Sequence, residues 1–308
     1  MKRTTSRLIV LSLILFANYS PALADSKIKV VTTIPDLADL GRRIGGDLVE
    51  VKSIATGVED PHAVPMKPSF AVLLNRADVL LLQGLALEHA FLPGLLDAAR
   101  NPKIMPGSPG YIDCSKYVLP RETPTKIDRS LGEQHPQGNP HFNLDPGFGK
   151  SIAKAITEGL TANYPEHAST FKRNFETFSA ELDRRLAQWE KEGAPLKGVK
   201  FVSYHPDMLY FAERFGMEPV GTIELRAGVD PTPSHIADLE ALMQREKVRL
   251  VIREKHYPAQ LAKTIAETTG SQLAETIVMV NGAAEAKDYF SFVDYNLHSL
   301  LNAVKGRN

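Results

Sequence analysis

The chain has 308 residues, and its 36 lysine and arginine residues are matched by 36 aspartate and glutamate residues. This balance provides no basic surface for nucleic acid and no strong attraction to an acidic membrane surface, so we expect neither as a partner. Cys114 is the only cysteine, which excludes an internal disulfide and leaves histidine, carboxylate and water as ligands for any bound metal.

The first 24 residues are expected to be an export signal. Residues 2–7 contain three basic side chains, residues 8–17 are mostly apolar, and residues 22–24 read Ala-Leu-Ala. This order is typical of a cleavable secretory signal, and the apolar run is shorter than the ~20 residues of a membrane-spanning helix. We predict cleavage after Ala24 and a periplasmic protein without a lipid anchor, because no cysteine lies at the predicted cleavage site.

Short apolar segments and amphipathic segments alternate in the next part of the chain. Residues 28–35, 49–55 and 78–84 are strand-like, with loop-like or helix-like stretches after them. Such short apolar runs between amphipathic helices indicate parallel strands that are covered on both faces. Residues 106–145 lose this periodicity and are rich in proline, glycine and charge, which predicts a long functional loop.

A long helical stretch separates this region from a second series of alternating segments. Its apolar residues have helical spacing, and Gly193 is a suitable end. Strand-like segments resume afterwards. We therefore predict an α/β fold with two lobes of mostly parallel sheet covered by helices, residues 25–162 and 198–308. One long backbone helix at 163–197 would join them, and a single stiff connection predicts a cleft that opens only slightly.

Three of the nine histidines stand out by their position. His62 follows a strand in "DPH", His141 precedes a helix in "NPHFNLDP", and His205 ends a strand in "FVSYHPD". Ligands of open α/β sheets bind beyond the carboxyl ends of the strands. The adjacent prolines restrict the loops, so less conformational entropy is lost when the imidazoles bind an ion. We therefore expect these three side chains to meet in the cleft between the lobes.

The other histidines have less distinctive surroundings. His135 lies in the long loop, where we expect exposure, with a role as a mobile accessory metal ligand as the alternative. The remaining five lie on or beside helix-like segments among charged residues and are interpreted as solvated or capping side chains: His89, His167, His235, His256 and His298.

The order of these motifs resembles the substrate-binding proteins of zinc and manganese ABC importers. The resemblance runs from about residue 28 to the C terminus. It is carried by "TTIPDLADLGRRIGGD", "DPHAVPMKPS", "NRADVLLLQGLALE", "NPHFNLDP" and "YHPDMLYFAERFGMEPVG". It implies two lobes joined by a rigid helix, one metal ion buried between them, and no enzymatic activity. It also implies delivery of the ion to the permease and ATPase subunits of an importer, and we expect a monomer.

The resemblance places His62, His141 and His205 on the first three metal ligands of the family. Members that resemble manganese binders often have a glutamate at the third position, whereas zinc binders have a histidine, as here. Zn²⁺ accepts imidazole readily and is satisfied by four ligands, while Mn²⁺ favours oxygen. We therefore expect Zn²⁺, with Mn²⁺ or Fe²⁺ as alternatives. Many zinc-binding members also have a histidine-rich loop, of which only His135 is present here.

The fourth ligand is where the sequence departs from the family. The family commonly supplies an aspartate before the last helix, but the segment 270–290 has no aspartate at the expected spacing. Glu275 is the best candidate, with an ordinary surface role as its alternative. Glu254 is a candidate for supporting the ligands or for replacing Glu275, and water in the fourth position is a further alternative.

Two other functions are compatible with parts of the sequence. Three histidines with an open water position would suit an exported zinc hydrolase, but the sequence has no "HExxH" and no acid placed beside a ligand as a general base. A protein of the same architecture that binds a chelated metal, such as a siderophore or haem, would need a wide cleft with arginine or aromatic lining. Tyr204, Tyr210 and Tyr257 could contribute to such a lining, but the paired "PH" motifs favour an uncoordinated ion.

Overall fold

The computed structural model describes residues 27–124, 135–224 and 228–306. The predicted export signal at residues 1–24 and part of the predicted loop at 106–145 therefore lie outside the described residues. Within the described residues, no helix combines the length and apolar character needed to cross a membrane.

The first lobe is built on a parallel four-stranded sheet with strand order β2-β1-β3-β4. All four residues of β3 are buried, as expected for a strand that is covered on both faces. The strands and the helices between them have these bounds: β1 Ile28–Thr32, α1 Pro35–Gly45, β2 Val49–Ser53, α2 Pro68–Asn75, β3 Val79–Leu82, α3 Leu92–Ala99 and β4 Tyr111–Asp113.

The second lobe repeats this topology with a sheet of order β6-β5-β7-β8, again with parallel strands. In both sheets the first strand of the lobe is internal, and the second strand lies at the edge beside it. Because all strands of a sheet are parallel, their carboxyl ends lie along the same edge. The elements of this lobe are β5 Lys200–Ser203, α6 Leu209–Phe215, β6 Glu218–Thr222, α7 Pro233–Glu246, β7 Leu250–Glu254, α8 Ala259–Thr269, β8 Gln272–Thr276 and α9 Tyr289–Val304.

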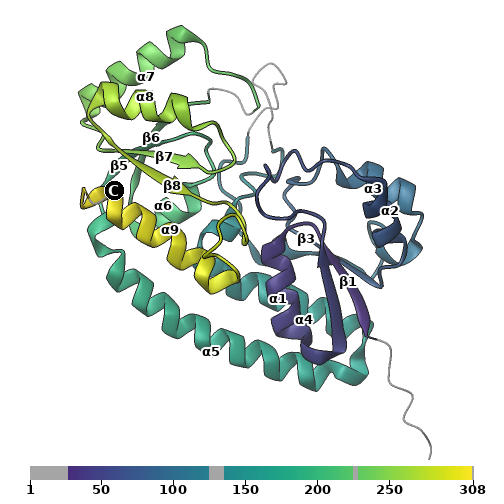
Figure 1. Cartoon of the computed structure of the whole chain (residues 1–308). Coiled ribbons are helices and arrows are strands. Elements are labelled where there is room, and N and C mark those ends of the chain that lie inside the picture. Colours follow the sequence, from purple (N-terminus) through teal and green to yellow (C-terminus); the bar gives the residue numbers. More distant parts are fainter. Residues whose placement is uncertain (1–26, 125–134, 225–227, 307–308) are drawn as a thin grey trace, which may run out of the picture.

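Two consecutive helices connect the lobes. Helix α4, Gly149–Asn163, packs on the first lobe, and α5, Ala168–Glu192, runs beneath both lobes (Figure 1). With 25 residues, α5 spans about 38 Å at 1.5 Å per residue. The indole Nε1 of Trp189 donates a hydrogen bond of 2.6 Å to Asp294 on α9, which ties the connecting helix to the second lobe. The predicted α/β class, with two helix-covered parallel sheets, is confirmed.

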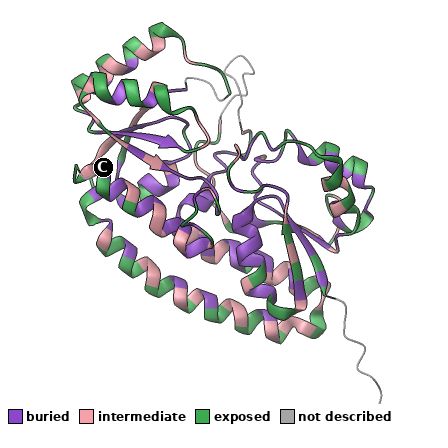
Figure 2. Ribbon diagram, in the orientation of Figure 1, coloured by how far each residue is buried: buried purple, intermediate pink, exposed green. Residues whose placement is uncertain are grey.

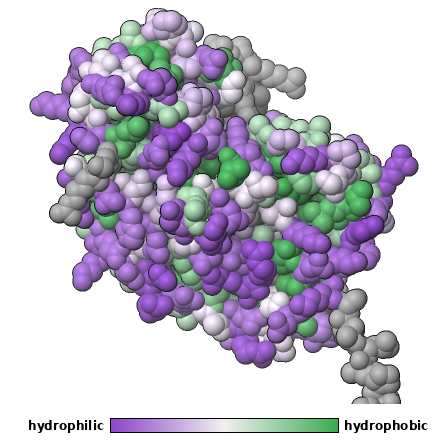
Figure 3. Space-filling model, viewed as in Figure 1, coloured by the Kyte–Doolittle hydropathy of each residue, from purple (hydrophilic) through white to green (hydrophobic). Residues whose placement is uncertain are grey.

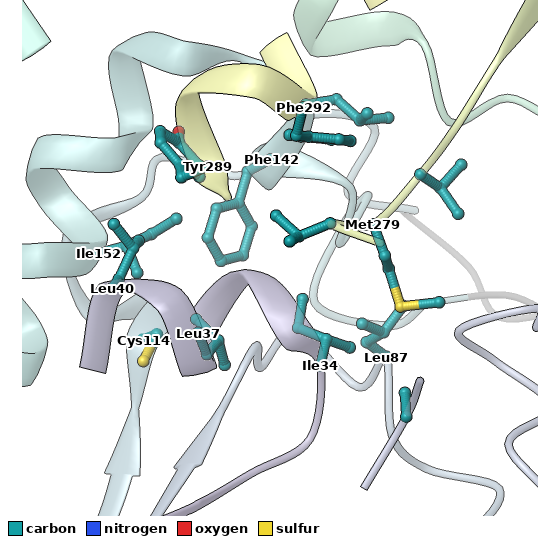
Figure 4. Close-up of a cluster of buried hydrophobic side chains, with 14 of the residues drawn as sticks. Ile34, Leu37, Leu40, Leu87, Cys114, Phe142, Ile152, Met279, Tyr289 and Phe292 are labelled. Atoms are coloured by element: carbon teal, nitrogen blue, oxygen red, sulfur yellow. The ribbon is translucent and has the colours of Figure 1, made fainter. Parts of the chain in front are cut away.

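One hydrophobic core continues from the first lobe across α1, α4 and α5 to α9. Figure 2 shows the buried residues concentrated along this joint and in the two sheets. In Figure 4, Phe142 lies between Leu37 of α1 and Tyr289 and Met279 of the second lobe. A separate, smaller core lies in the second lobe beneath α7 and α8. In contrast, the outer face in Figure 3 is mostly hydrophilic with scattered apolar residues, as is normal for a protein surface.

Hydrogen bonds connect the two lobes next to this shared core. Asp36 at the start of α1 accepts a hydrogen bond from the backbone N–H of Val280 at 3.0 Å and another from Asn143 at 3.1 Å. Asn143 also donates to the carbonyl oxygen of Val278 at 2.9 Å. Gly57 has a φ of +109°, and a Cβ there would lie 2.1 Å from the carbonyl oxygen of Val280. Only glycine therefore allows the backbones to approach this closely.

Candidate metal centre

The three histidines singled out from the sequence lie together at the carboxyl ends of the strands. His62 follows β2, His141 directly precedes the short 3₁₀ helix η5 (Phe142–Leu144), and His205 follows β5. All three are buried, with exposed fractions of 4–5%. Because the first two belong to one lobe and the third to the other, they face each other across the joint.

The rings of His62 and His141 are close enough to share one ion. The Nε2 atoms of His62 and His141 are 3.1 Å apart. Two nitrogens bound to one tetrahedral Zn²⁺ at 2.0–2.1 Å would be roughly 3.3 Å apart. The ring centroid of His205 lies 5.5 Å from that of His62 and 5.4 Å from that of His141.

The sequence favoured exposure for His135, but the structure places this residue against the cluster. It is half-buried, and its ring stacks on His62 with a centroid separation of 4.9 Å and an interplanar angle of 28°. One ring nitrogen from each of His62, His135 and His141 lies within 4.8 Å of the other two. His205, from the second lobe, is not in this set. His135 therefore adds an imidazole beside those of His62 and His141.

The two "[D/N]-P-H" motifs adopt the same local structure. The Oδ1 atom of Asp60 accepts the backbone N–H of His62 at 2.8 Å, and Oδ1 of Asn139 accepts the backbone N–H of His141 at 3.0 Å. Such a turn, in which a side chain bonds the backbone two residues on, is favoured by aspartate and asparagine. Together with the intervening proline it fixes where each histidine leaves the backbone. The prolines are evident in the sequence as restraints, whereas the role of Asp60 and Asn139 as acceptors becomes clear only from the structure.

Asn139 also connects the two halves of the site. Its Nδ2 donates a hydrogen bond of 2.8 Å to the carbonyl oxygen of Pro206, next to His205. The hydroxyl of Tyr210 in the second lobe donates to the carbonyl oxygen of Asn139 at 2.8 Å. The loops that carry His141 and His205 are thus hydrogen-bonded to each other through protein groups, which limits how far the lobes can separate there.

The histidines differ in their protonation. Burial lowers the pKa of His62 and His141 well below 6.5, and the neighbouring imidazoles lower it further. Burial also lowers the pKa of His205, but its hydrogen bond to Glu224 and the attraction of Asp207 outweigh burial, so this pKa is raised overall. His62 and His141 are therefore neutral and ready to bind a cation at neutral pH, whereas His205 retains a proton more readily.

Two buried acids lie behind His205. Burial raises the pKa of Asp207 to about 6 and raises that of Glu254 well above 4.5, with the Asp207 charge adding to the effect on Glu254. Glu254 ends β7 and is fully buried. Strand β7 pairs with β5, which leads into His205, so Glu254 lies near the His205 segment. Its role in supporting the ligands stays a prediction.

Glu275, the candidate fourth ligand, lies elsewhere on the sheet. It is in register with Arg253 on β7, and its carboxylate forms an ion pair with that guanidinium. Consecutive residues of a strand point to opposite faces, so Arg253 and Glu275 point away from the face that Glu254 occupies. The Glu275 side chain is 42% exposed. The following residues 277–280 contribute apolar side chains to the core.

The chain is similar to a known protein family and to individual metal-binding proteins over most of its length. Residues 30–303 match the family described as "Zinc-uptake complex component A periplasmic". The metal ABC transporter substrate-binding lipoprotein SloC of Streptococcus mutans is 25% identical over 311 residues and is covered to 99%, as is this chain. The zinc-binding lipoprotein AdcA of Streptococcus pneumoniae is 23% identical over 94% of this chain, which spans 58% of AdcA.

A solved structure is similar over almost the same range. The crystal structure of ZnuA matches with a TM-score of 0.75 and 25% identity, covering 91% of this chain and 100% of the other. The similarity therefore includes both lobes and the helix between them.

Proposed function

Because the chain belongs to the family of periplasmic zinc-uptake components, which are metal-binding substrate-binding proteins of ABC importers, we propose that its cargo is Zn²⁺. Members of this family act outside the cytoplasm and are not enzymes, so the hydrolase alternative is removed. The permease and ATPase subunits of an importer are the partners that this role requires.

The observation that carries the proposal is the convergence of imidazoles from both lobes. We assign His62, His141 and His205 as ligands, since their ring centroids lie within 5.5 Å of one another and all three side chains are buried. A cation is favoured because two of these imidazoles are kept neutral by burial. Nitrogen ligands in a four-coordinate set suit Zn²⁺ better than Mn²⁺, which prefers oxygen and more ligands.

His135 is our candidate for the fourth ligand in place of Glu275. One of its ring nitrogens lies within 4.8 Å of one nitrogen each of His62 and His141. Glu275, in contrast, is paired with Arg253 on the face of the sheet opposite to Glu254. A set of four neutral imidazoles would leave the +2 charge of the ion to be balanced by nearby carboxylates, of which Glu224 and Asp207 are buried beside His205.

Metal competition tests the identity of the cargo. Protein purified without chelator should contain one zinc ion per chain. After stripping, zinc should bind at least about 100-fold more tightly than manganese, following the order of affinities for nitrogen sites. Isothermal titration with each metal, and zinc titration in excess manganese, measure this preference. Stoichiometric manganese or ferrous iron that zinc fails to displace would support the alternative cargo instead.

Zinc affinity should also fall as the pH is lowered. Because the pKa of His205 is raised, its imidazole binds a proton in the metal-free protein below that pKa, and zinc must displace this proton. Apparent affinity should therefore drop by up to about tenfold per pH unit below the pKa of His205 and level off above it. Titrations at pH 8, 7, 6 and 5.5 measure the slope. Equal affinity at pH 5.5 and pH 8 would exclude histidine ligation.

A further inference from the structure

A buried carboxylate lies directly behind one of the three histidines. Glu224 follows β6, and its backbone N–H donates to the carbonyl oxygen of Tyr204 at 2.9 Å, which brings its side chain next to His205. The Oε2 atom is 3.1 Å from Nδ1 of His205, and the two side chains are 7% and 6% exposed. Because a carboxylate only accepts hydrogen bonds, Nδ1 of His205 must be the donor.

The carboxylate is held from its other side by an aromatic pair. The hydroxyl of Tyr257, in the segment after β7, donates to the same Oε2 at 3.4 Å. The ring of Tyr257 stacks on that of Tyr204, with centroids 4.3 Å apart and an interplanar angle of 11°. Segments that follow β5, β6 and β7 therefore meet at Glu224, and contacts from all three hold its carboxylate beside His205.

This geometry defines what Glu224 can do for the ion. The two nitrogens of an imidazole lie on different edges of the ring, so an oxygen bonded to Nδ1 does not also reach an ion on Nε2. The hydrogen bond instead fixes the tautomer with the proton on Nδ1 and the lone pair on Nε2. It also limits rotation of the ring and increases the basicity of Nε2.

We propose that Glu224 is a positioning residue of the metal site, which presents Nε2 of His205 to the ion before the ion arrives. The second lobe then enters the complex with its ligand already oriented, as the turns at Asp60 and Asn139 orient the ligands of the first lobe. The inference rests on the proposed function, because it requires His205 to be a ligand. Partners of this kind contribute about 10–100-fold to metal affinity.

Two substitutions of Glu224 and one control test the inference in the full-length chain. Glu224→Ala removes the acceptor, and Glu224→Gln keeps the size and one neutral acceptor, so it also guards against a folding defect. We expect zinc affinity at pH 7.5 to fall about 10–100-fold in Glu224→Ala and less in Glu224→Gln. Glu218→Ala, at the exposed start of the same strand, should bind zinc as the unmodified protein does.

The tautomer of His205 provides a readout that general destabilisation would not produce. In the metal-free protein, at a pH above the pKa of His205 where its ring is neutral, ¹⁵N spectra of the histidine rings should show His205 protonated at Nδ1, and Glu224→Ala should convert this signal to a mixture of tautomers. Unchanged affinity and an unchanged His205 tautomer in both Glu224 variants would overturn the inference. In that case, His205→Ala separates the two proposals. If His205→Ala also leaves zinc affinity unchanged, the proposed metal site fails together with the role of Glu224. If His205→Ala abolishes zinc binding, His205 remains a ligand and only the role of Glu224 fails.

Discussion

Replacing His141 by alanine is expected to reduce zinc affinity by at least about 1000-fold, since loss of an outer partner alone costs about 10–100-fold. His141 is buried, its Nε2 lies 3.1 Å from Nε2 of His62, and its ring faces His205 across the joint. Its removal takes away one of the two ring nitrogens that lie closest together in the site. Titration against a chelator of known affinity measures the loss.

The fold should survive this substitution. The backbone turn at Asn139 does not use the imidazole, so we expect the metal-free protein to stay folded, with its free energy of unfolding lowered by about 0.5–3 kcal/mol for the loss of a buried side chain. His298→Ala, on the exposed side of α9, is the matched control and should leave zinc affinity unchanged. Near-normal zinc binding by His141→Ala, with the control also normal, would remove His141 from the site.

Replacing Phe142 by alanine should cause a large loss of stability. Phe142 is fully buried and packs in the core that joins the lobes, with Leu37 and Tyr289 around it (Figure 4). Removing a buried phenyl ring typically costs about 3–5 kcal/mol, because the cavity that remains collapses only partly. Urea unfolding of the metal-free protein measures the change.

The same substitution should also weaken zinc binding, because Phe142 anchors the residue next to His141. We expect the affinity to fall less than in His141→Ala, since the ligand itself remains. Val72→Ala on α2, where Val72 is 52% exposed, should change stability by about 0.5 kcal/mol or less. A comparable stability for Phe142→Ala and Val72→Ala would mean that the interlobe core does not support the site.

Much of the fold could be predicted from the sequence because its signals are local. Buried parallel strands are short continuous apolar runs, as in β3, and the long helix α5 has a sustained helical periodicity. Three histidines could be selected because each lies beside a proline near a predicted element end. In contrast, the shared strand order of the two sheets could not be predicted from the sequence, because the two lobes show no internal sequence repeat. Strand pairing is set by packing between segments that are distant along the chain.

The positions of His135, Glu224 and Glu275 could not be predicted from the sequence, because they are set by contacts between segments that are distant along the chain. His135 belongs to a segment without periodicity, so nothing local indicated that its ring stacks on His62. Glu224 reaches His205 only because β6 and β5 are neighbours in the sheet. The face of Glu275 follows from its register with Arg253, and a shift of one residue would reverse it.

A crystal structure of the zinc-loaded protein, with the ion located by its anomalous scattering, tests the central claim most directly. Ring nitrogens of His62, His141 and His205 should each lie about 2.0–2.1 Å from one zinc ion. A zinc ion bound by side chains of one lobe only, or at another place on the protein, would contradict it.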